Sequence, residues 1–119
     1  MKKILVVDDD REICNLVEQI LSSKNYYVIS VASASEALKQ IKSNSFDLIL
    51  LDMHLPDGNG IDLLPKFMSA QNIPVILMTA FGNWKSHVRS YEFGAYYFLD
   101  KPFRINLLRN LVKQALHSY

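Results

Sequence analysis

Residues 46–52 carry the sequence FDLILLD, an apolar run that ends on the carboxylate of Asp52. The run has the length of a strand and is rich in leucine and isoleucine, which is typical of a strand buried on both faces. Pro56, Gly58 and Gly60 follow shortly afterwards and predict a loop. We therefore expect Asp52 to lie at the mouth of a buried strand, where the chain turns into a loop.

The same layout occurs near the start of the chain. The sequence ILVV at residues 4–7 runs directly into Asp8, Asp9 and Asp10. Open α/β sheets bind ligands outside the carboxyl ends of their strands, so two such strands side by side would bring these carboxylates together. Crowded carboxylates repel one another and ionise together only at a cost unless a cation is bound. Mg²⁺ prefers oxygen ligands and is the cofactor that we expect at this edge.

Strand-like and helix-like segments alternate along the whole chain. Such alternation predicts an α/β protein with a parallel sheet covered by helices on both faces, in one domain over residues 1–119. We expect strands over residues 3–7, 27–32, 48–52, 75–79 and 96–99. We expect helices over residues 11–23, 33–41, 60–70, 84–93 and 105–116, with Leu16 and Leu107 among the inward-facing side chains.

Three details of the predicted helices depend on single residues. Ser33 and Glu36 have the spacing of a capping box, which marks a helix start. Pro65 lies about a turn into the helix over residues 60–70, so either that helix starts late or it is kinked. Arg104 is a poor cap for the last helix, and Asn106 could cap a shorter one instead.

Composition excludes several classes of protein. The 119 residues suit one domain, and a net charge of +1 gives no basic stripe for nucleic-acid binding. No apolar run approaches the ~20 residues that a membrane span requires. Asp8–Asp10 interrupt the first apolar run, so we predict no signal peptide. The single cysteine, Cys14, is expected to be a small helix residue, and a reducing cytoplasm is its simplest setting.

Two further polar side chains lie at the carboxyl ends of predicted strands. Thr79 ends the strand over residues 75–79, and Lys101 comes just after the last strand. The strand ends together offer carboxylates, a hydroxyl and an ammonium, which suits the transfer of a phosphoryl group to a carboxylate. Asp52 is the best nucleophile because it stands alone at its strand end, whereas the pair Asp8 and Asp9 is better suited to hold Mg²⁺.

The predicted site residues lie in four stretches of the chain, which are ILVVDDD, DMHLPDGNG, VILMTAFG and GAYYFLDKPF. In this order and spacing, the chain resembles the receiver domain of two-component response regulators over nearly its whole length. The resemblance implies a flavodoxin-like, doubly wound sheet of five strands in the order 2-1-3-4-5, with five helices.

The resemblance also implies a role for each site residue. Asp52 matches the phosphoacceptor, and Asp8 and Asp9 match the acidic pair that binds Mg²⁺ together with Asp52 and the backbone carbonyl of His54. The remaining matches are Thr79 as the conserved hydroxyl, Lys101 as the conserved lysine and Phe98 as the switch aromatic. By the same resemblance the Lys101–Pro102 peptide bond should be cis. His54 and Phe81 would flank the path of the water that hydrolyses the acyl phosphate, and we expect that hydrolysis to be slow.

The function that follows is a phosphorylation-dependent switch. A receiver of this kind takes its phosphoryl group from a histidine kinase or a histidine phosphotransfer protein and then changes its affinity for an output domain or a downstream protein. It is not an enzyme beyond catalysing its own phosphorylation and slow autodephosphorylation. The alternative is a small phosphatase that resembles haloacid dehalogenases, with Asp8 as nucleophile, because Asp8–Asp10 form an Asp-x-Asp pattern after the first strand. The short chain and the DMHLPDGNG loop count against that alternative.

Overall fold

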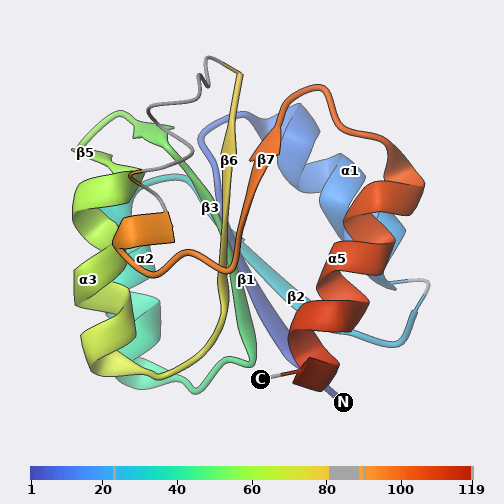
Figure 1. Cartoon of the computed structure of the whole chain (residues 1–119), viewed down its shortest axis with the longest axis horizontal. Coiled ribbons are helices and arrows are strands. Elements are labelled where there is room, and N and C mark those ends of the chain that lie inside the picture. Colours follow the sequence, from blue (N-terminus) through green and yellow to red (C-terminus); the bar gives the residue numbers. More distant parts are fainter. Residues whose placement is uncertain (23, 81–88, 90, 119) are drawn as a thin grey trace.

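The computed structural model describes residues 1–22, 24–80, 89 and 91–118, and its centre is a parallel sheet of five strands (Figure 1). The strands lie in the order β2-β1-β3-β6-β7, which is the predicted order 2-1-3-4-5. A short antiparallel pair, β4 and β5, accounts for the difference in labels, and the sequence did not predict it. The strand bounds are β1 Lys3–Val7, β2 Tyr27–Val31, β3 Leu48–Asp52, β4 His54–Leu55, β5 Gly58–Asn59, β6 Val75–Thr79 and β7 Tyr97–Asp100.

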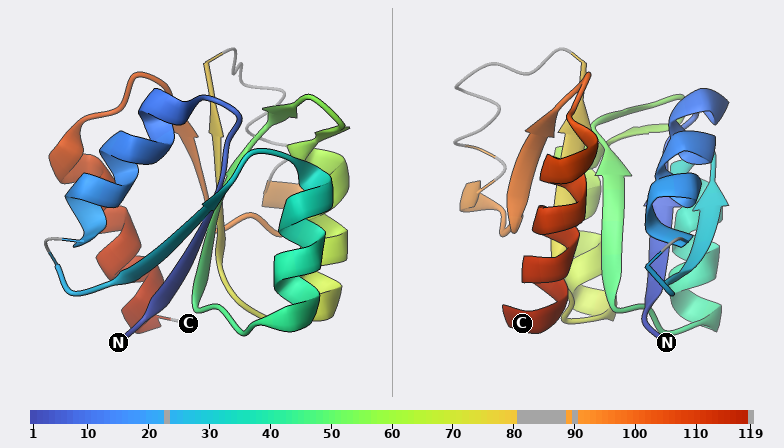
Figure 2. Two further views of the ribbon diagram at one scale, coloured as in Figure 1. Left: turned by 180° about the vertical axis from the view of Figure 1, so that it is seen from behind. Right: turned by 90° about the vertical axis from the view of Figure 1, so that its right-hand side faces the viewer.

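Helices cover both faces of the sheet. Figures 1 and 2 show α2 and α3 on one face and α1 and α5 on the other. The described residues hold four of the five predicted helices, while the helix expected over residues 84–93 falls largely outside them. The helix bounds are α1 Arg11–Ser22, α2 Ala34–Ser43, α3 Gly60–Ala70 and α5 Ile105–Ser118.

The central strands are buried on both faces because each contributes side chains to two separate cores. β3 and β6 are buried at every residue. Alternate side chains of a strand point to opposite faces, so Leu51 packs toward α2 and α3 while Leu50 packs toward α1 and α5. A continuous run of leucine and isoleucine therefore satisfies both layers at once.

Two predicted inward-facing leucines prove to be exposed. Leu16 of α1 is 37% exposed and Leu107 of α5 is 39% exposed. The buried stripe of α1 passes instead through Cys14, Val17 and Leu21, at spacings of three and four residues. Both leucines lie beside the buried stripe of their helix. The spacing of apolar residues alone did not distinguish the edge of the stripe from its buried centre.

The starts of α3 and α5 decide the two alternatives left open by the sequence. α3 begins at Gly60, where the Asn59 side chain accepts a hydrogen bond from the Ile61 N–H at 2.8 Å, so Pro65 lies inside the helix and a late start is wrong. α5 begins at Ile105, and the Leu108 N–H donates to the Arg104 carbonyl at 3.1 Å. The shorter helix capped by Asn106 is therefore wrong as well.

Gln71 holds the loop between α2 and β3 through three hydrogen bonds. Its amide nitrogen donates to the carbonyls of Ile41 and Asn44 at 2.9 and 2.7 Å, and its amide oxygen accepts from the Phe46 N–H at 2.9 Å. We expect Gln71→Ala to lower the free energy of unfolding by about 2–3 kcal/mol, because several backbone groups lose their partners together. Urea unfolding measures the change.

Gln40→Ala is the matched control for that variant. The Gln40 side chain makes one exposed hydrogen bond, to the Asn44 amide at 2.9 Å. Its removal should change the free energy of unfolding by less than about 0.5 kcal/mol. Equal losses for the two variants would show that Gln71 is not a special anchor.

Candidate functional site

The carboxyl ends of β1 and β3 bring two buried carboxylates together, and Lys101 reaches them from the end of β7. β1 and β3 are neighbours in the sheet, with Val7 opposite Leu51, so Asp8 and Asp52 follow at the same edge. The Lys101 Nζ lies 2.6 Å from the Asp8 Oδ2 and 3.6 Å from the Asp52 Oδ1. Three residues that are far apart in the sequence thus form one ionic cluster.

The cluster lies at a small cavity of about 180 Å³. His54 and Ala80 belong to its lining, together with the three ionic residues and the exposed side chains of Asp9 and Asp10. The structure therefore brings together all of the predicted acidic residues, the lysine and His54. The Lys101–Pro102 peptide bond is cis, as the family resemblance implied.

The acidic residues fit a magnesium ion. Asp8, Asp9 and Asp52 each offer a carboxylate oxygen, and these oxygens lie within 4.8 Å of one another. Oxygen ligands at about 2.1 Å from a shared Mg²⁺ lie within about 4.2 Å of one another, so a small adjustment of side chains is enough. The donor set consists of hard oxygen atoms, which is the chemistry that Mg²⁺ prefers.

The pKa of Asp52 is raised from 3.8 to about 6. Burial is the largest cause, and the nearby Asp8 carboxylate adds to it. The Lys101 ammonium and a hydrogen bond from the His54 backbone N–H act in the opposite direction. Without a bound cation, Asp52 is thus a carboxylate held in an environment that disfavours its charge.

The surroundings favour the charged form of Lys101, whereas they disfavour that of Asp52. Burial acts to lower the pKa of Lys101, but its hydrogen bond to Asp8 and the charge of Asp52 outweigh burial and raise that pKa above its ordinary value. The ammonium is therefore charged at neutral pH. The site offers a fixed positive group next to a carboxylate of raised pKa.

The raised pKa of Asp52 predicts how stability depends on pH in metal-free buffer. The folded state binds a proton on Asp52 more tightly than the unfolded chain does, so this group makes the fold less stable as the pH rises from about 4 to about 6. We expect Asp52→Asn to raise the free energy of unfolding at pH 7 by roughly 2–3 kcal/mol. The gain should disappear near pH 4, and urea unfolding at both pH values measures it.

Asp62→Asn is the control for that comparison. Asp62 lies on α3 with an exposed side chain and is not part of the cavity. Its replacement should give no gain of this size at either pH. A destabilised Asp52→Asn protein at neutral pH would contradict the unfavourable burial of the charge.

Thr79 and Phe98 are buried and do not line the cavity. Thr79 ends β6 and is fully buried, while its carbonyl accepts a hydrogen bond from the Lys101 N–H at 2.8 Å. Phe98 of β7 is 2% exposed and packs in the core under α2 and α3. Phe81, which was expected to flank the path of water, lies outside the described residues.

Sequence reasoning missed that Asp10 caps a helix and that Asp57 binds the start of another. The Asp10 Oδ1 accepts a hydrogen bond from the Glu12 N–H at 3.0 Å and so caps α1. Asp57, in the turn between β4 and β5, accepts from the N–H groups of Ala34 and Ser35 at 2.8 and 3.0 Å, and these bonds lower its pKa. An aspartate just before an amphipathic helix is a recognisable cap. The bonds of Asp57 join distant segments, and no local pattern signals them.

A sequence model of the response regulator receiver domain matches residues 4–113, which is nearly the whole chain. The chain belongs to the response regulator receiver family. The alternative of a haloacid-dehalogenase-like phosphatase has no support. Phosphorylation of an aspartate in two-component signalling is typical of the receiver family. Proteins of this family are signalling proteins.

Known relatives agree with this assignment. The receiver is 41% identical over 103 residues to the transcriptional regulatory protein CpxR of Escherichia coli K12, a match that covers 87% of this chain and 44% of CpxR. It spans about half the length, or less, of the curated relatives that it matches.

Solved structures of other receivers have the same fold. A CheY-like receiver domain protein from Methanospirillum hungatei JF-1 superposes with a TM-score of 0.94 at 34% identity, covering 99% of this chain and 95% of that one. The beryllofluoride-activated receiver domain dimer of NtrC4 gives a TM-score of 0.96 at 33% identity and covers 100% and 99% of the two chains. In the part of this receiver that the structure describes, none of the helices is long and apolar enough to cross a membrane.

Proposed function

We propose that residues 1–119 act as one receiver unit in the cytoplasm, in which Asp52 accepts a phosphoryl group from the phosphohistidine of a histidine kinase or of a histidine phosphotransfer protein. The observation that carries this proposal is the position of Lys101, whose Nζ lies 3.6 Å from the Asp52 Oδ1 at the shared cavity. An acceptor carboxylate needs a fixed positive group beside it, because negative charge accumulates on the phosphoryl oxygens during transfer.

In the transfer step, an oxygen of the Asp52 carboxylate attacks the phosphorus atom of the donor. A phosphorus–oxygen bond forms and the phosphorus–nitrogen bond to the donor imidazole breaks, with the electron pair returning to the ring nitrogen. The Lys101 ammonium, already held near Asp52 by its bond to Asp8, attracts an equatorial oxygen of the phosphoryl group. The Asp52 carboxylate must be ionised in order to attack, so neutralisation of its neighbours promotes the reaction.

The acidic residues hold the cofactor for this reaction. We assign Mg²⁺ to the carboxylates of Asp8, Asp9 and Asp52 and to the backbone carbonyl of His54. When bound, Mg²⁺ supplies positive charge that offsets the charge on the phosphoryl oxygens.

The phosphorylated receiver changes its affinity for a C-terminal output domain or a separate downstream protein. Thr79 and Phe98 are the residues that we assign to this switch. They lie on neighbouring strands, with Leu77 opposite Phe98 and Thr79 opposite Asp100. The Thr79 hydroxyl would move toward a phosphoryl oxygen and bind it. The side chain of Phe98 would then turn into the space that the hydroxyl leaves.

The receiver also removes its own phosphoryl group, slowly. Hydrolysis requires a water molecule in line with the bond to Asp52. His54 lies at the cavity but has an exposed imidazole, and neither it nor Phe81 is an acid or amide suited to orient that water. These residues favour a long-lived acyl phosphate.

Mass spectrometry with a small-molecule donor tests the proposal. We expect the protein to gain the mass of one phosphoryl group when it is incubated with acetyl phosphate and Mg²⁺, and to gain none when EDTA is present. Reduction of the acyl phosphate with borohydride should convert Asp52, and no other aspartate, to homoserine. Labelling that does not require a divalent cation, or that maps to Asp8 or Asp9, would refute the assignment.

A further inference from the structure

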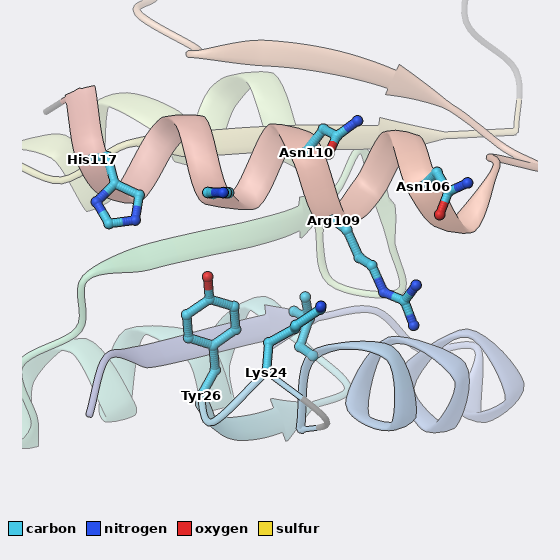
Figure 3. A pocket seen from close by; sticks show the side chains of 8 residues that line it. Lys24, Tyr26, Asn106, Arg109, Asn110 and His117 are labelled. Carbon is cyan, nitrogen blue, oxygen red and sulfur yellow. The ribbon is translucent and has the colours of Figure 1, made fainter.

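A second cavity lies between α1 and α5, and it shares no residue with the acceptor cavity. It has a volume of about 410 Å³, which is within the range of small-molecule sites. Its lining comes from the end of α1, from the segment that leads into β2 and from one side of α5 (Figure 3). The lining residues are Leu21, Lys24, Tyr26, Asn106, Arg109, Asn110, Lys113 and His117.

Among the described residues, the lining of the cavity includes three cationic side chains and no acidic one. Arg109 and Lys113 lie four residues apart on α5, and such neighbours face the same side of a helix. Lys24 approaches from the opposite wall, so three cations surround one space although the whole chain has a net charge of only +1. Like charges at this spacing destabilise a helix, and a bound anion would remove that repulsion.

None of these three cations is neutralised within the part of the chain that the structure describes. The ion pairs there both belong to Lys101. The Nε of Arg109 is buried and has no hydrogen-bond partner among the described residues. A buried donor without a partner is uncommon in a folded protein and points to a missing acceptor.

The other groups of the lining can also donate hydrogen bonds. Figure 3 shows the Arg109 side chain extending from α5 toward α1, while Tyr26 and Lys24 point back toward α5. The amides of Asn106 and Asn110 and the hydroxyl of Tyr26 add neutral donors to the guanidinium and the ammonium groups. Guanidinium groups bind phosphate through paired hydrogen bonds, and lysines contribute point charges.

We propose that this cavity binds a small molecule that carries two or more phosphate groups. Three separated cations match a ligand whose negative charges are spread over more than one group, whereas a single anion could contact only part of the lining. The site is independent of Asp52 in position, because its lining contains no acceptor-site residue.

Nuclear magnetic resonance titration of the wild-type chain tests this site, with pyrophosphate and a nucleoside diphosphate as separate probes in metal-free buffer of constant ionic strength. Both probes should shift the amide signals of Tyr26, Arg109 and Lys113 and leave those of Asp52 unchanged. Tighter binding of the nucleoside diphosphate would show that the organic part also contacts the cavity, and equal binding would assign recognition to the phosphates. Absence of saturable shifts, shifts centred on Asp52, or equally tight binding of citrate would overturn the proposal.

Charge-matched variants separate this site from general electrostatic attraction. Arg109→Gln/Lys113→Gln should weaken pyrophosphate binding by about 10- to 100-fold, because two charge-assisted contacts are lost. Lys42→Gln/Lys66→Gln removes the same charge from exposed residues of α2 and α3 and should bind as wild type does. Lys113→Gln alone, at an exposed position, provides the test if replacement of Arg109 disturbs folding. Equal weakening in the control would show that only net charge matters.

Discussion

The Asp52→Asn protein is expected to take up no detectable phosphoryl group from acetyl phosphate or from a phosphorylated histidine kinase. Asparagine preserves the size and shape of the side chain, but its amide cannot supply the nucleophilic oxygen. The proposed attack uses Asp52 alone among the three clustered carboxylates, so no neighbour should take its place. Intact-protein mass after incubation with acetyl phosphate and Mg²⁺ measures the loss.

The control for this experiment is Asp62→Asn, which removes an exposed carboxylate that does not line the acceptor cavity. It should be phosphorylated as fully as wild type. Stoichiometric labelling of Asp52→Asn would show that another carboxylate is the acceptor, and mapping of the label would then identify it.

The second large effect is expected at Gly60, the first residue of α3. A Cβ atom there would lie 2.8 Å from the Met53 Cα and 2.9 Å from the Asp52 carbonyl oxygen, and both are backbone atoms that cannot rotate away. The Gly60 N–H also donates to the Met53 carbonyl at 2.7 Å. We expect Gly60→Ala to lower the free energy of unfolding by about 2–3 kcal/mol, because the end of β3 must move to make room.

The same displacement should slow phosphorylation, since Asp52 belongs to the backbone that moves. Gly58→Ala is the matched control, because a Cβ atom at Gly58 would meet only side-chain atoms of Leu63 and Ala34, at 3.4 and 3.5 Å. This variant should retain nearly the stability and the phosphorylation rate of wild type. A Gly60→Ala protein as stable as the Gly58→Ala control would show that the loop adapts easily.

The sheet and the acidic cluster could be predicted from the sequence because both follow from local pattern. The run at residues 46–52 had the length and composition of a buried strand, and it proved to be the centre of the sheet. Strict alternation of strands and helices predicted parallel pairing, and the strand order implied by the family resemblance placed Asp8 and Asp52 at one edge, where the structure has them. The capping pattern at Ser33 was confirmed as well, since the Ser33 hydroxyl accepts a hydrogen bond from the Glu36 N–H at 3.2 Å.

What the sequence did not predict depends on contacts between distant segments. The Asp57 carboxylate binds the start of α2, and Gln71 binds the end of the same helix and the loop beyond it, although neither residue has a local signature. A late start of α3 at Pro65 was one expectation, but the helix starts at Gly60, where Asn59 caps it. In these cases tertiary contacts and caps, which periodicity does not record, decide the outcome.

The partners of Asp8 have a consequence for how the acceptor site takes up a cation. The Oδ1 of Asp8 accepts the Asp10 N–H at 2.9 Å, and the Oδ2 pairs with the Lys101 ammonium at 2.6 Å. The metal-free site therefore contains a built-in counterion, and Mg²⁺ held by Asp8 would share that carboxylate with the ammonium or displace it. Uptake is in this sense an exchange of one positive charge for another. An ammonium displaced from Asp8 in this way would be free to contact the group that Asp52 receives.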